Sequence, residues 1–452
     1  MLEGPLLLLV LALAIVFIIV ATAKIKLHPF LALIFAAYMV GLFTGMPIGE
    51  LTDIITSGFG NLMRYIGLVI VTGTIIGVIL EKSGAALRMA EVIIRIVGER
   101  RPQLAMSLIG AVVSVPVFCD SGYVILASLS RATAQRAKVS LASMSVALAT
   151  GLYATHTLVP PTPGPIAAAG NIGASDYLGV VILFGVLVSI PTIAVGYLWA
   201  TRVAASIHID ISDLPIPEET PANIATSALP ATWKSLAPIL VPVILISSGS
   251  VVAFSGYSGT GAALVSFLGA PTTALFVGLL FAFLLFPRFN EETLTQWIGA
   301  GIQAAAPILL ITCAGGAFGS VLSATPIAEL IKGLAEGGLF GGAFVLVLPF
   351  AIAAALKSAQ GSSTAALVVT SALIAPLLEG MGVVSPVQLA LVVMAVGAGA
   401  MTVSHANDSY FWVVTQFSGM SVKDAYKAQT MATLVQGITA FLTAFLLYAV
   451  LV

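Results

Sequence analysis

The chain has 452 residues, of which 59% are hydrophobic and only 8% carry a charge. Soluble domains are about 45–50% apolar and about 25% charged. This composition excludes a soluble enzyme and indicates an all-α polytopic membrane protein. The net charge of −1 argues against nucleic acid as a partner. The two cysteines, Cys119 and Cys313, lie inside apolar runs and indicate neither a disulfide framework nor a metal site.

Ten stretches approach the length of about 20 apolar residues that a spanning helix needs. The first is followed by Ala21-Thr22-Ala23, which resembles a signal-peptidase site. A signal peptide has a basic segment before its apolar run, whereas Glu3 is the only charged side chain here, so we expect an uncleaved helix. The predicted spans are 5–22, 29–46, 64–80, 139–157, 177–200, 236–254, 264–286, 300–322, 387–404 and 430–451.

Two further apolar stretches, 103–130 and 340–378, are interrupted by small and polar residues. The interruptions are Cys119-Asp120-Ser121-Gly122 and Gln360-Gly361-Ser362-Ser363-Thr364. Each stretch therefore predicts a re-entrant hairpin, with two half-helices that meet at a tip inside the membrane. The polar, proline-containing stretch 202–234 predicts a cytoplasmic linker.

The distribution of Lys and Arg predicts the orientation, because these residues concentrate in cytoplasmic loops. With the N-terminus outside and both hairpins returning to their own side, most of the 18 basic residues fall in the cytoplasm. Reading either hairpin as a full crossing spoils this distribution. We therefore expect both termini on the periplasmic side of a bacterial inner membrane.

The two halves of the chain repeat the same order of elements. Residues 1–201 and 235–452 each contain three spans, a hairpin, a span that ends in a polar break, and a last span. Thr155-His156 and Ser404-His405 mark the two breaks. Since the first half begins outside and the second begins inside, the halves are predicted to be inverted repeats. Inverted repeats with broken helices are typical of secondary transporters, whose site lies between the repeats.

Polar groups at the tips and breaks must contact protein, water or a ligand, because lipid cannot pair them. Half-helices that begin near Ser121 and Gly361 would present free N–H groups, which attract anions. Asp120 is either a proton or cation carrier or an N-cap. Lys357, one turn before the second tip, either pairs with an anionic substrate, pairs structurally with Asp120 or Asp408, or extends its ammonium to water.

The breaks supply further candidates. His156 and His405 titrate near neutral pH or join helices by hydrogen bonds, and Asp408 belongs to a polar cluster or satisfies a helix end. Pro160–Pro165 is expected to be non-helical, either lining the path or forming a stiff linker. The candidate substrate- or proton-binding residues are Asp120, Ser121, Gly122, Thr155, His156, Lys357, Gln360, Gly361, Ser362, Ser363, Thr364, Ser404, His405, Asn407 and Asp408.

These motifs resemble the gluconate permease family of gluconate:proton symporters. The resemblance is carried by Pro116–Gly122, Ala154–Pro165, Ala359–Ser362 and Ser404–Asp408 followed by Phe411-Trp412. It implies proton-coupled uptake of sugar acids such as gluconate, of other small hydroxylated carboxylates or of D-serine. It also implies an elevator-like movement, a homodimer, and substrate contact by Asp120, Ser121, Gly122, Gln360, Gly361 and Ser362. Lys357 stands where the family usually has Arg, which replaces a bidentate clamp by a point charge.

Three alternatives remain open from the residues alone. Sodium coupling is the nearest, because carbonyl groups at the tips can coordinate Na⁺. A passive anion channel could use the same hairpins. An intramembrane hydrolase is disfavoured, because the sequence lacks a Gly-x-Ser-x-Gly elbow. We therefore expect a transporter and not an enzyme, with no cofactor other than a coupling ion, which the resemblance implies is H⁺.

Overall fold

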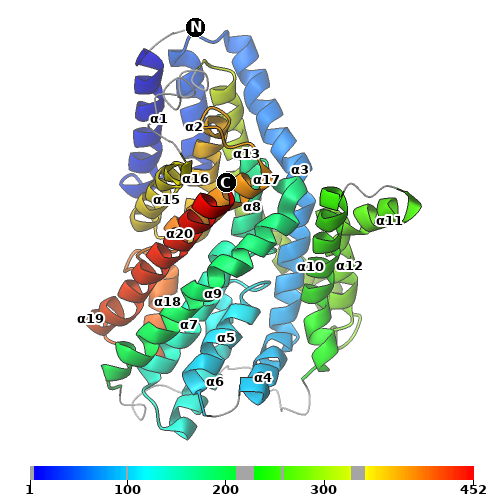
Figure 1. Cartoon of the computed structure of the whole chain (residues 1–452), viewed down its shortest axis with the longest axis vertical. Coiled ribbons are helices and arrows are strands. Elements are labelled where there is room, and N and C mark those ends of the chain that lie inside the picture. Colours follow the sequence, from blue (N-terminus) through cyan, green and yellow to red (C-terminus); the bar gives the residue numbers. More distant parts are fainter. Residues whose placement is uncertain (1–4, 98–99, 210–228, 256–258, 327–341) are drawn as a thin grey trace.

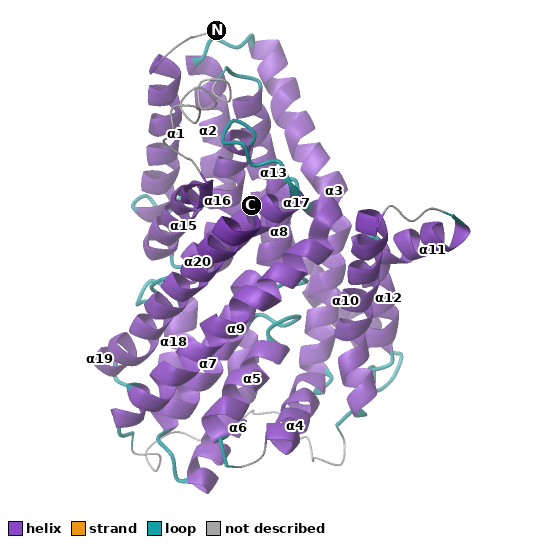
Figure 2. Ribbon diagram, viewed as in Figure 1, coloured by secondary structure: helices purple, strands orange, loops and turns teal. Residues whose placement is uncertain are grey.

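The computed structural model is helical throughout the part of the chain that it describes, residues 5–97, 100–209, 229–255, 259–326 and 342–452 (Figures 1 and 2). Six of its helices are long and apolar enough to cross a membrane, or seven when one bent pair counts as a single span. They are Ile48–Lys82, Ser175–Ser206, Thr232–Val252, Glu292–Ser323, Gly342–Gln360 and Val422–Leu451. The chain is thus a multi-pass membrane protein.

The first three helices are α1 (Pro5–Ala23), α2 (Pro29–Phe43) and α3 (Ile48–Lys82). The span expected at 64–80 is only the second part of α3. Its first part is amphipathic: Leu51 and Ile55 are buried while Asp53 and Asn61 are exposed. A search for a continuous apolar run therefore misses this part, although helical periodicity marks it.

The first hairpin follows the short amphipathic α4 (Ala85–Val97) and consists of α5 (Pro102–Val113) and α6 (Cys119–Ala137). The two helices pack against each other in the lower part of Figure 1. The turn lies at 114–118, and not at 119–122 as predicted. Pro116, which lacks a backbone N–H, lies in this turn. Asp120 is consequently in the first turn of α6.

The first broken helix is formed by α7 (Leu141–Leu158) and α8 (Pro163–Ile172). The prediction that all of Pro160–Pro165 is non-helical is wrong, because α8 begins at Pro163. Proline is tolerated in the first turn of a helix, where its missing N–H would have no partner in any case. After the short 3₁₀ turn Ser175–Tyr177, α9 (Leu178–Arg202) runs back toward the lower end in Figure 1.

Residues 210–228 of the predicted linker lie outside the described residues, and α10 (Thr232–Ser255) begins after them. The single span predicted at 264–286 is instead two helices, α11 (Thr260–Gly269) and α12 (Pro271–Phe283), bent by 68°. The bend lies where Pro271 begins the second helix. A π-helical turn (Glu292–Trp297) then leads into α13 (Ile298–Ser323), which packs against α2 and α3.

The second hairpin lies in the upper part of Figure 1. Residues 340–341 of its predicted range lie outside the described part. A 3₁₀ turn (Gly342–Leu346) precedes α15 (Val347–Gln360), and α16 (Ser363–Leu378) packs back against α15. The turn at Gly361-Ser362 falls within the predicted tip.

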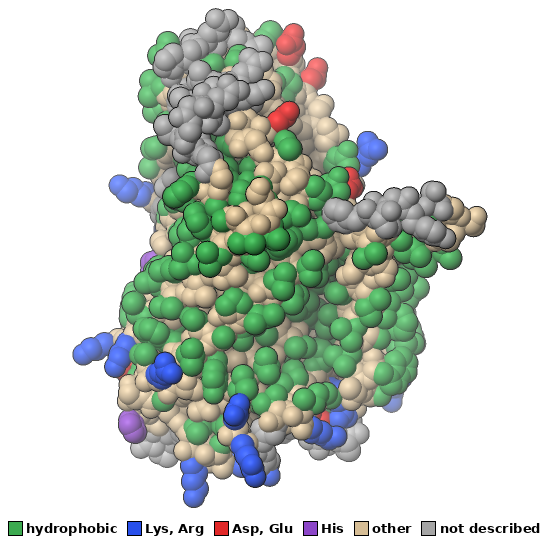
Figure 3. Space-filling model, viewed as in Figure 1, with side chains coloured by type: hydrophobic (Ala, Val, Ile, Leu, Met, Phe, Trp, Pro, Cys, Tyr) green, Lys and Arg blue, Asp and Glu red, His purple; other side chains and the backbone are tan. Residues whose placement is uncertain are grey.

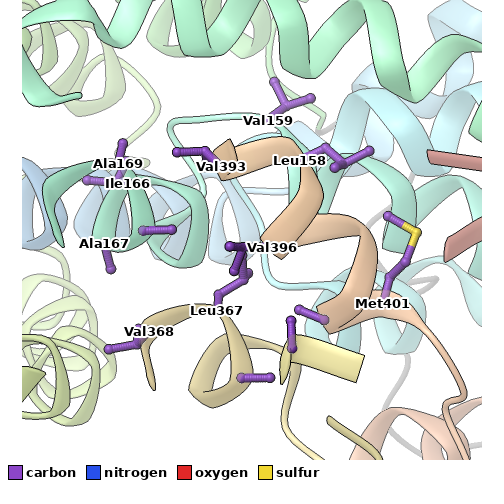
Figure 4. Packing of buried hydrophobic residues seen from close by; sticks show 14 of the residues in the cluster. Leu158, Val159, Ile166, Ala167, Ala169, Leu367, Val368, Val393, Val396 and Met401 are labelled. Carbon is purple, nitrogen blue, oxygen red and sulfur yellow. The ribbon is translucent and has the colours of Figure 1, made fainter. Parts of the chain in front are cut away.

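The second broken helix is formed by α17 (Pro386–Met401) and α18 (Ser409–Ser418), separated by residues 402–408. The chain ends with α19 (Val422–Ala425), a π-helical turn (Tyr426–Thr430) and α20 (Met431–Leu451). The interior between the breaks is apolar: side chains of α8, α16 and α17, among them Ile166, Leu367 and Val396, surround one another in Figure 4.

The first hairpin is held against the first broken helix by close backbone contact between α5 and α7. A Cβ atom added at Gly110 would lie 2.5 Å from the Leu148 carbonyl oxygen and 2.6 Å from the Leu152 nitrogen. No larger residue fits there without moving a helix. Small residues permit such close packing between membrane helices.

Candidate functional site

A buried ion pair lies where the second hairpin meets the second break. The Lys357 ammonium, in the last turn of α15, contacts the Asp408 carboxylate oxygen Oδ2. Lys357 is 0% exposed and Asp408 is 3% exposed. Burying two charges is expensive unless their remaining hydrogen-bonding positions are also filled.

The partners of Asp408 meet that requirement. Asp408 is the N-cap of α18 and accepts a hydrogen bond from the Tyr410 backbone N–H at 3.1 Å. The buried Ser404 hydroxyl donates to Oδ2, the same oxygen that contacts Lys357. Ser404 is itself held by the α20 end of the chain, through the Thr433 and Thr430 hydroxyls at 2.9 and 2.6 Å.

The tip of the second hairpin is tied directly to the break. Gly361 has a left-handed backbone (φ +79°) and ends α15, and a Cβ atom there would collide with the Asn407 carbonyl. Asn407 Nδ2 donates to the Ser358 carbonyl at 2.7 Å. His405 Nε2 lies 3.0 Å from the same oxygen. Ser362, exposed at the rim, caps α16 by accepting from the Ala365 N–H.

The first hairpin reaches the same place. The Asp120 carboxylate accepts a hydrogen bond from the Ser409 hydroxyl at 3.1 Å. Because Asp120 lies in the first turn of α6 and Ser409 begins α18, the positive ends of these two helix dipoles lie close together. The first break is fixed to the first hairpin by Thr162, whose hydroxyl donates to the Val115 carbonyl at 3.0 Å.

Aromatic rings of α7 and α18 form one wall of the site. The Tyr153 ring stacks on the rings of Tyr410 and His156, with distances between ring centres of 5.0 and 6.5 Å. The Lys357 ammonium lies 5.7 Å from the centre of the Tyr153 ring. His156 Nδ1 is buried and has no hydrogen-bond partner among the described residues, whereas the buried Tyr153 hydroxyl lies near the Ser363 hydroxyl. Buried polar atoms without partners are costly, so His156 Nδ1 is suited to bind a polar ligand.

Other predicted site residues contact groups that do not belong to the ion pair. The Thr155 hydroxyl donates to the Ala111 carbonyl of α5 at 2.8 Å. Gln360 Nε2 donates to the Thr22 hydroxyl of α1 at 2.9 Å. The Ser121 hydroxyl lies near the Glu81 carboxylate of α3. Gly122 faces Leu152 of α7, and Thr364 lies near Gly164 of α8.

The sequence reasoning missed Tyr153, Ser409 and Tyr410. A tyrosine one helical turn before His156 in an apolar helix was an available signal for Tyr153. Nothing comparable marked Ser409 and Tyr410, which follow Asp408 at the start of an ordinary amphipathic helix. Ser363, also a predicted site residue, is buried in the first turn of α16, with its side chain near the Tyr153 hydroxyl.

A large cavity is lined by neither residue of this ion pair. It has a volume of about 880 Å³ and is lined by α3, α8, α13 and α16, with Asp53, Asn61, Asn171 and Asp176 among its residues. Within the described part of the chain, no cluster of three His, Cys, Asp or Glu side chains could hold a metal ion.

The many apolar helices and the polar centre buried at the broken helices are typical of a membrane transporter. Residues 6–451 match the family described as GntP family permease; the chain belongs to this family and is a permease, not an enzyme. It is similar to the gluconate permease of Pseudomonas aeruginosa, with 32% identity over 96% of this chain and 95% of that protein. It is also similar to the D-serine transporter DsdX of Escherichia coli, with 29% identity over 95% of each chain.

The fold resembles that of a solved transporter with little sequence similarity. The YdaH transporter of Alcanivorax borkumensis matches with a TM-score of 0.66 at 15% identity, over 94% of this chain and 98% of that chain. The family match and the 32% identity to a gluconate permease confirm the resemblance inferred from the motifs. The chain is also similar to YgbN of Escherichia coli, with 31% identity over 95% of each chain. That relative is named an inner membrane permease.

Proposed function

We propose that this permease is a secondary active transporter that takes up a small hydroxylated carboxylate, gluconate or a related sugar acid, together with protons across the inner membrane. The observation that carries this proposal is Lys357. It is the only Lys or Arg side chain among the described residues that is fully buried. A buried ammonium at a centre of helix N-termini and hydrogen-bond donors attracts a carboxylate.

The polyhydroxyl part of such a substrate has partners next to Lys357. On the aromatic wall beside the ammonium, His156 Nδ1 has no partner among the described residues, and the Tyr153 hydroxyl lies near the Ser363 hydroxyl. Ser362 and Ser409, at the starts of α16 and α18, add two exposed hydroxyls near the ion pair. A site that hydrogen-bonds substrate hydroxyls discriminates strongly against analogues without them, which favours hydroxy acids over plain fatty acids.

We further propose that the chain consists of two inverted repeats, 1–201 and 235–452, joined by the cytoplasmic linker 202–234. A shared relation supports this: each break donates a hydrogen bond to the backbone of its own hairpin, Thr162 to Val115 in the first turn region and Asn407 to Ser358 at the end of α15. On the face in Figure 3, most visible basic side chains lie at the lower end, as expected for a cytoplasmic side with both termini periplasmic. The elevator-like movement and the homodimer follow from the resemblance.

A D-serine symporter is the second candidate. The relative named as a D-serine transporter aligns over 95% of this chain, and D-serine offers a carboxylate and a hydroxyl to the same groups. Sodium coupling and passive anion conduction are the remaining alternatives to proton symport.

Transport into proteoliposomes distinguishes these candidates. With the outside more acidic, labelled gluconate is expected to accumulate by up to about tenfold per unit of pH gradient, for one proton per substrate. A sodium gradient alone is expected to give none, and a panel of hydroxy acids with D-serine ranks the substrates by competition. Accumulation driven only by a sodium gradient would show that the coupling ion is Na⁺ and not H⁺. Equilibration of gluconate without accumulation would indicate a channel. Protein-free vesicles serve as the control.

A further inference from the structure

The Lys357 ammonium has no position left for a substrate in this structure. An ammonium has three N–H donors. Its surroundings here are the Asp408 carboxylate, the Gly361 carbonyl oxygen at 3.1 Å, and the face of the Tyr153 ring at 5.7 Å. A substrate carboxylate can therefore reach this ammonium only by displacing one of them.

Of the three neighbours of the Lys357 ammonium, Asp408 is the one that a substrate carboxylate can replace with a group of the same chemistry and charge. The Gly361 carbonyl is fixed by the end of α15, whose Gly361 N–H bonds the Lys357 carbonyl at 2.9 Å. The Tyr153 ring is fixed by stacking on Tyr410. We infer that Asp408 occupies, in the empty carrier, the place that the substrate carboxylate takes in the loaded carrier, and that the displaced Asp408 takes up the transported proton. This inference rests on the proposed function.

The hydrogen-bonding groups around Asp408 can pair with both its ionised and its protonated carboxyl group. In the ionised form, Oδ2 accepts from the Ser404 hydroxyl and Oδ1 accepts from the Tyr410 N–H. A hydroxyl can donate or accept. In the protonated form, the new O–H on Oδ2 can donate to the Ser404 oxygen while Oδ1 keeps its bond to Tyr410. The protonated carboxyl thus keeps both of its hydrogen-bonding partners, while the buried Ser404 hydroxyl must turn its own hydrogen to another acceptor.

The exchange balances in charge. The empty site holds one ammonium and one carboxylate; the loaded site holds the ammonium, one substrate carboxylate and a neutral Asp408, with the proton taken from water. The pair contributes no net charge in either state, which avoids the cost of carrying a charge through the membrane interior. One proton enters with each monocarboxylate, so its transport is expected to be electroneutral.

Several other ionisable side chains lie near Asp408, on the helices and the break that pack around it. Asp120 of α6 bonds Ser409 and is the competing proton carrier, and His405 of the break is tied to the Ser358 carbonyl. His156 and Tyr153 face the site from α7. The remaining ones are Cys119 beside Asp120 and Tyr410 on α18.

Calorimetry of gluconate and D-serine binding to the purified full-length protein tests the inference. Titrations in two buffers of different protonation enthalpy give the number of protons taken up per substrate. We expect about one for the unmodified protein, with a dissociation constant that falls about tenfold for each unit decrease in pH. For Asp408→Asn we expect about zero protons, retained binding and no pH dependence. Asp176→Asn, an acid-to-amide change outside the site, is the matched control and should behave like the unmodified protein.

Four results would overturn the inference. Binding without proton uptake by the unmodified protein refutes it while leaving carboxylate transport intact, whereas binding of neither compound refutes the proposed function as well. Loss of proton uptake in Asp120→Asn but not in Asp408→Asn assigns the proton to Asp120. If Asp408→Asn does not fold, the infrared difference spectrum of the unmodified protein decides: gluconate must produce the band of a newly protonated carboxylic acid, and its absence refutes the exchange.

Discussion

Lys357→Gln is expected to remove high-affinity gluconate binding and with it uptake. Losing one partner of a buried, hydrogen-bonded charge pair costs about 2–5 kcal/mol, which is roughly 30- to 5,000-fold in affinity. The reason is specific to this site, because Lys357 is buried against Asp408 and no other fully buried Lys or Arg occurs among the described residues. Equilibrium binding of labelled gluconate to purified protein measures the change.

Two further variants separate recognition from folding. Lys357→Gln alone leaves the Asp408 carboxylate buried without its counter-ion, which also lowers stability. The double variant Lys357→Gln with Asp408→Asn removes both charges and is expected to recover thermal stability but not binding. Lys357→Arg keeps the positive charge and should retain measurable binding. Full gluconate affinity in a folded double variant would show that Lys357 does not hold the substrate.

Gly361→Ala is expected to disrupt the second tip far more than an alanine at another left-handed glycine. A Cβ atom at 361 would collide with the Asn407 carbonyl oxygen and lie 2.6 Å from its carbon and 3.1 Å from the Asp408 nitrogen. The tip would have to move away from the residue that pairs with Lys357. We expect at least a roughly tenfold loss of gluconate affinity, equivalent to about 1.4 kcal/mol, in the same binding measurement.

Gly382 provides the matched control for this substitution. Its backbone is also left-handed, with φ +75° against +79° for Gly361, but no atom lies within 4 Å of an added Cβ. Gly382→Ala therefore carries only the backbone penalty, about 1 kcal/mol. Equal losses of stability and unchanged gluconate binding in both variants would show that the contact between the tip and the break is unimportant.

The interruptions of the apolar pattern located the hairpins well. Polar residues are costly inside a membrane, so Gln360–Thr364 marked the second tip, where α15 ends and α16 begins. The first tip was placed a few residues too late. Its turn, 114–118, is mostly apolar and contains Pro116, so polarity marked the first turn of α6 instead.

The pairing of residues between hairpins and breaks could not be predicted. Lys357 and Asp408 are 51 positions apart, and from the sequence Asp120 and Asp408 were equal candidates for the pair. The direction of side chains near a helix break is equally hidden, because the local axis changes there. Gln360 consequently points to α1 and Thr155 to α5, away from the ion pair.

A disulfide cross-link between the first hairpin and the second break tests the central geometry most directly. Asp120 and Ser409 hydrogen-bond at 3.1 Å, so cysteines at these positions lie within reach of each other. The experiment uses a background with Cys119→Ser and Cys313→Ser, in native membranes, with a protease site in the linker to reveal joined halves. Ser385→Cys, at the far end of α17 about 24 Å from the break, replaces the second cysteine as the control.

We predict that mild oxidation joins the two halves of the Asp120→Cys, Ser409→Cys protein and that a reductant separates them, while the control pair stays unlinked. Failure of positions 120 and 409 to cross-link, with each labelled by an impermeant thiol reagent from opposite sides of the membrane, would contradict a shared centre between the hairpin and the break.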